Sequence, residues 1–136
     1  MTMRIHHTLH ILFALAALLL TACTSYDEAP ETVRVTVQLV YPDGSAIGPY
    51  EGARVELINA NASTFVDSTD ASGVATFDVP GGLYSAVSSE VYIDTVSAVH
   101  YRYIFNGRMD QQVISPDSVS NNITIKLTMT RKRYWG

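Results

Sequence analysis

Residues 67–84 constrain the fold more than any other stretch of the sequence. Every second residue in its central part is apolar, at Ala75, Phe77 and Val79, while Thr76 and Asp78 lie between them. Turns rich in glycine, proline and aspartate flank this alternation on both sides. A period of two between such turns is typical of a half-buried strand in an antiparallel sheet. We therefore expect one row of side chains in a core and the other in solvent.

The same alternation recurs along the chain after residue 32. Expected strands cover residues 33–40, 53–58, 64–68, 74–79, 83–88, 99–105 and 121–130. Residues 113–114 could add a short strand, and Asn106-Gly107 is a turn signal. Short strands with regularly spaced turns predict an all-β fold, a seven-stranded antiparallel β-sandwich at residues 32–130.

The first 22 residues are typical of an export signal. An apolar run at residues 11–20 is too short to span a membrane, and it ends in Leu20-Thr21-Ala22-Cys23. This ending resembles the bacterial lipoprotein box, which implies cleavage before Cys23 and acylation of that cysteine. The resemblance predicts an outer membrane lipoprotein, either periplasmic or surface-exposed. An ordinary signal peptide followed by a chance cysteine is the alternative.

Cys23 is the only cysteine of the chain, so no intrachain disulfide can form. Acylation explains an unpaired cysteine in an exported protein, and several acyl chains attach a protein more firmly than one. Residues 23–31 are polar and acidic, which predicts a flexible tether. Asp27 and Glu28 resemble acidic surface-export signals of Bacteroidetes lipoproteins, although a solvated linker is an equal alternative. The net charge of -4 argues against nucleic acid as a partner.

Three motifs resemble the prealbumin-like fold of carboxypeptidase regulatory-like and Cna-B-like domains. The family patterns G-A-x-V-x-L, T-D-x-x-G-x-A-x-F and P-x-G-x-Y match residues 52–57, 69–77 and 80–84. The chain departs from the family at Leu83, where a polar residue is common. The resemblance implies a prealbumin/transthyretin-like sandwich but indicates little about function, because this architecture serves many roles.

No catalytic set emerges from the sequence, so we expect a protein without enzymatic activity or cofactor. His100 is the only histidine after the export signal, and a lone histidine between tyrosines is more often structural than catalytic. Transthyretin-like hydrolases use several histidines and arginines that are missing here. The Lys–Asn bond of some Cna-B-like domains needs a lysine in the core, whereas Lys126 is expected to face solvent.

Acidic residues flank several turns, but their spacing matches no EF-hand. Turn capping is the expected role of these residues, and no metal site is predicted. They are Asp43, Asp67, Asp70 and Asp78.

Candidate binding residues lie on an aromatic strand and in a basic, aromatic tail expected at residues 131–136. Arginine and tryptophan are favoured at protein contacts. A solvated tail, or a tail whose tryptophan packs back onto the domain, is the alternative. The candidates are Tyr101, Tyr103, Arg131, Arg133, Tyr134 and Trp135.

Three triplets resemble the Asp-Ser/Thr-apolar O-glycosylation pattern of Bacteroidetes, at residues 67–69, 94–96 and 117–119. Their hydroxyls belong to Ser68, Thr95 and Ser118. Because such short motifs often occur by chance, ordinary turn residues are the alternative.

Together these features predict a lipid-anchored envelope protein that serves a structural, assembly or binding role. The alternative is a glycan-binding accessory protein of a TonB-dependent nutrient-uptake system. Exposed rings that stack on sugars would favour this alternative, and buried rings would weaken it. The rings in question are Tyr92, Tyr101, Tyr103, Tyr134 and Trp135.

The anchoring hypothesis predicts that Cys23→Ser abolishes acylation and releases the protein from membranes. Membrane fractionation with metabolic labelling by a fatty acid measures both effects. A variant that still sediments with membranes and is processed at the wild-type rate would show that the protein is not a lipoprotein of this kind.

Overall fold

A computed structural model describes residues 31–133, which form eight strands and no helix. Cys23, Tyr134 and Trp135 therefore lie outside the described residues. No helix in the described part is long and apolar enough to cross a membrane. The strands are β1 (Thr32–Val40), β2 (Arg54–Asn59), β3 (Thr64–Ser68), β4 (Val74–Pro80), β5 (Gly82–Asp94), β6 (Tyr101–Ile114), β7 (Asn122–Lys126) and β8 (Thr128–Arg133).

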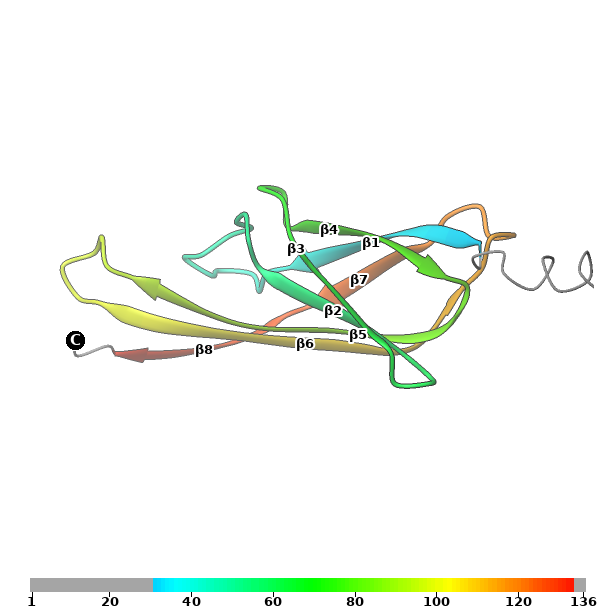
Figure 1. Cartoon of the computed structure of the whole chain (residues 1–136). Coiled ribbons are helices and arrows are strands. Elements are labelled where there is room, and N and C mark those ends of the chain that lie inside the picture. Colours follow the sequence, from blue (N-terminus) through cyan, green and yellow to red (C-terminus); the bar gives the residue numbers. More distant parts are fainter. Residues whose placement is uncertain (1–30, 134–136) are drawn as a thin grey trace, which may run out of the picture. The chain divides into compact units, whose positions relative to one another are not determined.

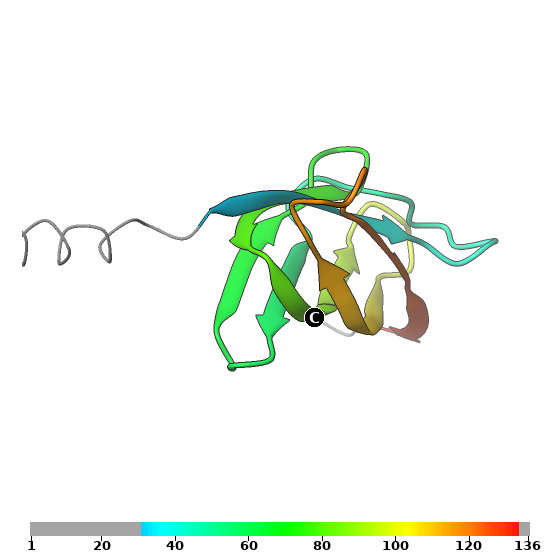
Figure 2. The same cartoon turned by 90° about the vertical axis from the view of Figure 1, so that its right-hand side faces the viewer.

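The strands form two stacked sheets, as Figures 1 and 2 show. One sheet has the order β4-β1-β7, and the other has the order β3-β2-β5-β6-β8. The all-β, sandwich-like prediction is confirmed, but β1 and β7 run parallel. The expectation of antiparallel pairing throughout is wrong for this pair. A short hairpin can join only antiparallel strands, whereas parallel strands need a long connection. β1 and β7 are separated by most of the chain, so they are free to pair in parallel.

The core contains the apolar rows that the alternation predicts. Val35, Val55 and Leu57 have no exposed surface, and Phe77 is 5% exposed. Thr76 lies on the opposite face and is exposed. Alternate side chains are thus buried most regularly in β1, β4 and β7, and burial of apolar surface is the main stabilising contribution to folding.

β5 and β6 form one long hairpin whose loop lies at residues 95–100. The predicted turn at Asn106-Gly107 is wrong, because Gly107 lies inside β6 and pairs with Ser88. A side chain cannot be accommodated at this position. A Cβ on Gly107 would overlap Ile125 Cγ2 and come within 3.0 Å of Leu127 Cδ2. The glycine therefore permits a close crossing of the chain over β6.

The predicted last strand is divided at Leu127 between the two sheets. β7 pairs with β1, while β8 pairs with β6 in the other sheet. Strands commonly change sheets in this way at the corners of sandwiches. β8 continues to Arg133, so the predicted end of the domain at residue 130 is wrong: residues 131–133 pair with β6 as part of the sheet.

The crossing at Gly107 yields a stability prediction. Gly107→Ala should lower the free energy of unfolding by about 1–3 kcal/mol, because the added methyl group overpacks the core. Gly48→Ala is the matched control, since no atom lies within 4 Å of the position of its Cβ. The control should change stability by less than about 0.5 kcal/mol. Urea unfolding measures both, and equal losses would contradict the close packing.

Candidate functional site

The strands β5, β6 and β8 extend beyond β2 as a three-stranded projection (Figure 1). β2 pairs with β5 only as far as Val87, whereas β5 and β6 continue to their loop and β8 accompanies β6 there. We call residues 89–94, 101–106 and 128–133 the wing. One wing face continues the core side of the sheet, and the other continues its solvent side.

The inner face of the wing is aromatic, and the β1–β2 loop packs on it. Tyr41 meets Phe105 edge-on with ring centroids 5.0 Å apart, and Tyr50 lies 5.2 Å from Tyr92. Tyr103 is only 4% exposed within this cluster. Its ring is therefore a core element, and the expected role of Tyr103 in binding loses its basis.

The structure brings Tyr101, Arg131 and Arg133 together at the open end of this face. Arg133 is opposite Tyr101 in the ladder, and Arg131 is opposite Tyr103. The guanidinium carbon of Arg131 lies 4.5 Å from the centroid of the Tyr101 ring, which is cation–π geometry. Tyr101 is half-buried and both arginines are exposed. The ring thus holds Arg131 in place with its charge accessible.

Cations gather on the wing, and Arg102 and Lys132 face each other on its outer side. Elsewhere three arginines pair with acids, in the pairs Arg34–Asp78, Arg54–Glu56 and Arg108–Asp110. Within the described range, no ion pair joins Arg131 or Lys132 to an acidic side chain. The wing end therefore carries positive charge on a domain whose chain is acidic overall.

The Tyr50 hydroxyl is buried beneath the β1–β2 loop. It has no hydrogen-bond partner within the described chain, although the Tyr41 hydroxyl is near enough to affect its ionisation. Burial, followed by the charges of Tyr41 and Glu90, raises the pKa of Tyr50 far above its ordinary value. A buried polar group without a partner costs free energy.

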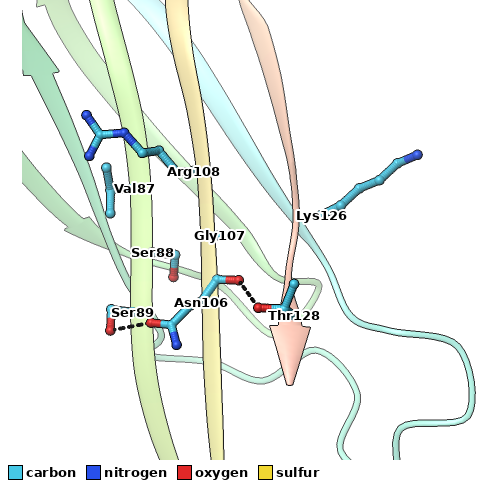
Figure 3. Close-up of a pocket in the computed structure, with 8 residues that line it drawn as sticks. All are labelled: Val87, Ser88, Ser89, Asn106, Gly107, Arg108, Lys126 and Thr128. Carbon is cyan, nitrogen blue, oxygen red and sulfur yellow. Dashed lines mark hydrogen bonds between the residues drawn. The ribbon is translucent and has the colours of Figure 1, made fainter. Parts of the chain in front are cut away.

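A shallow depression of about 480 Å³ lies on the solvent side where the chain crosses β6 (Figure 3). Ser89 Oγ donates to Asn106 Oδ1 at 2.8 Å, and Thr128 Oγ1 donates to the Asn106 carbonyl at 3.1 Å. Arg108 and Lys126 flank the depression with their charged groups pointing away from it. Its hydroxyl and amide groups can form hydrogen bonds with a ligand, but the lining residues include no carboxylate or imidazole for proton transfer.

The three hydroxyls of the glycosylation-like sequences are all exposed, on the β3 edge and in two separate loops. They are Ser68, Thr95 and Ser118. Their exposure is compatible with modification, which stays a prediction. Lys126 is exposed as predicted.

The turn-capping role expected of Asp70 is confirmed. Asp70 Oδ1 accepts hydrogen bonds from the amides of Ser72 and Val74. Asp94 does the same in the hairpin loop, where hydrogen bonds from the Ser97 hydroxyl and the Val96 amide lower its pKa. Residues 31–133 contain no group of three or more acids, histidines or cysteines that could hold a metal ion.

Comparisons with family models, curated proteins and solved structures find no match to this chain. The geometry of the site is therefore the basis for inferring a function. Sequence reasoning missed Arg102 and Lys132 as a pair, because their proximity depends on the β6–β8 register. The basic triplet at residues 131–133 was the available signal for that pair.

Two tyrosines allow a matched test of hydroxyl pairing. Tyr84 Oη donates to the Pro80 carbonyl at 2.6 Å, so Tyr84→Phe should lower the free energy of unfolding by about 1 kcal/mol. Tyr50→Phe removes an unpaired hydroxyl and should leave stability unchanged or raise it. Urea unfolding at neutral pH compares the two variants, and a larger loss for Tyr50→Phe would reveal a partner of its hydroxyl.

The raised pKa of Tyr50 also predicts a dependence on alkaline pH. Above its ordinary value of 10.0, the unfolded chain loses this proton while the folded chain keeps it. The unfolded state then binds fewer protons, so stability falls as the pH rises past that value. Tyr50→Phe should make this fall shallower. Identical pH profiles of unfolding for the variant and the wild type would contradict the burial of this hydroxyl.

Proposed function

We propose that this protein is a non-enzymatic, lipid-anchored module of the bacterial envelope that binds a partner through the inner face of its wing. The lipoprotein-type ending at Cys23 supports attachment to the outer membrane, on its periplasmic or its outer surface. The two stacked sheets provide a stable support for a binding surface.

We also propose the finer assignment to the prealbumin-like sandwiches. The motif spacings that suggest it have physical roles here. Tyr84 of P-x-G-x-Y reaches back to the Pro80 carbonyl, and Thr69 of T-D-x-x-G links two segments. The Thr69 hydroxyl accepts from the Ala53 amide at 3.0 Å and donates to the Tyr50 carbonyl at 2.9 Å.

The stacking of Arg131 on Tyr101 is the observation that carries the binding proposal. Arginine is enriched at the energetic centres of protein interfaces, and its guanidinium matches a carboxylate in shape and charge. A guanidinium already held by a ring loses less conformational entropy when a partner binds. A protein partner with exposed carboxylates fits this surface best.

The glycan-binding alternative receives less support. It relied on several exposed rings, but Tyr103 is buried and Arg131 covers one face of Tyr101. Sugars stack on open ring faces, so the inner face of the wing offers fewer of them than the sequence suggested.

Chemical crosslinking in intact cells tests the proposal. Arg131→Gln with Arg133→Gln should remove a crosslinked species that the wild type forms, because both guanidinium groups leave the surface. Arg34→Gln with Arg54→Gln is the control with the same change in net charge on other parts of the domain. The crosslinked species should persist in this control.

If the species survives in both variants, the contact lies elsewhere and the proposed role of this face is wrong. If both variants lose it, net charge rather than the site governs the association. Thermal unfolding of each variant shows whether a loss reflects the surface or the fold.

A further inference from the structure

The two sheets differ in the chemistry of their solvent faces. The β4-β1-β7 sheet presents mainly polar side chains there, such as Arg34, Thr76 and Thr124. The strands of the other sheet expose large apolar side chains, among them Val66, Leu83, Val91, Ile93 and Val113. A sandwich normally keeps its outward-facing residues polar, so this second face differs from the usual pattern.

The outer face of the wing combines apolar and cationic side chains in two cross-strand rows. The register aligns Val91, Ile104 and Thr130 in one row. The next row contains Ile93, Arg102 and Lys132. Val91 is 54% exposed and Ile93 is 42% exposed. We call these six residues the wing outer face.

We propose that the wing outer face docks onto a lipid surface that carries anionic headgroups. In this arrangement the aliphatic side chains enter the boundary between headgroups and acyl chains, while the two cations contact phosphates. Surface-bound segments generally combine buried apolar area with electrostatic attraction in this way. The inference rests on the proposed lipid anchor, which would hold the domain beside a membrane.

The size of the patch favours a lipid surface over a protein partner. A stable protein interface buries about 800 Å² on each side, or about 20–30 residues, whereas this patch has few side chains and no aromatic ring. A weak contact is sufficient when an anchor already supplies a high effective concentration. A second copy placed symmetrically on this face would bring Arg102 and Lys132 near like charges.

Docking would also orient the domain. The start of β1 and the β5–β6 hairpin loop lie at opposite ends of the sandwich (Figure 1). A domain held by the wing would therefore lie along the membrane, with the β4-β1-β7 sheet facing away. The hairpin loop turns toward the side of the β4-β1-β7 sheet (Figure 1), so the position closest to lipid is Val91 on the wing outer face, which is 54% exposed.

Site-specific fluorescence on the mature, acylated chain tests this arrangement. Because Cys23 is the only natural cysteine and would be acylated, Val91→Cys provides a single site for a polarity-sensitive dye on the wing outer face. Val119→Cys is the matched control, a fully exposed valine in the β6–β7 loop. The protein is placed in vesicles of phosphatidylcholine, alone or mixed with phosphatidylglycerol.

Only the label at residue 91 should shift to the blue, and only in vesicles that contain phosphatidylglycerol. Arg102→Gln with Lys132→Gln should lower the ratio of docked to undocked protein about thirty-fold, the effect expected for two cations near an anionic surface. Arg34→Gln with Lys126→Gln loses the same charge from the other sheet and should change this ratio less than about twofold. High salt should weaken docking in the wild type.

An absent shift at residue 91, or equal shifts at both labels, would overturn the proposal. A shift that depends on protein concentration without vesicles would overturn it in favour of a second copy. Flotation of the vesicles reports the anchor separately. If the chain does not float with the vesicles, the proposed lipid anchor is wrong. Adding vesicles to the unanchored, labelled protein then still measures whether the wing outer face binds anionic lipid.

Discussion

The close packing of Ile125 and Leu127 against Gly107 is the contact on which the arrangement of the two sheets depends. It lets β7 pass over β6 and allows the chain to leave one sheet and enter the other within one residue. β8 can then extend beside β6 and complete the wing. The packing thus links the core to the surface where the proposed binding sites lie.

The wing separates two kinds of chemistry by the alternation of its strands. Arg131 and Arg133 share the inner face with Tyr101, whereas Arg102 and Lys132 share the outer face with aliphatic side chains. One short basic segment can therefore serve two surfaces. A partner and a membrane would not compete for the same side chains.

The β1–β2 loop has a second role besides joining two strands. Its Tyr41 and Tyr50 cover aromatic side chains that the wing would otherwise expose. The loop achieves this at the cost of burying the Tyr50 hydroxyl without a partner. The aromatic row that suggests a binding surface in the sequence is thus largely a packing surface in the fold.

The sequence by itself determined the strand class, the core face of the strands that alternate clearly, such as β1, β4 and β7, and most of the turns. Period-two alternation reports which side chains are buried, as at Phe77 and Val55, but it does not report which strand lies alongside. Tertiary structure decided that Asn106-Gly107 continues a strand, because packing of Ile125 outweighed a local turn preference. It also decided that residues 131–133 join the sheet and that Tyr103 is buried. These outcomes depend on contacts between distant segments, and no local pattern encodes such contacts.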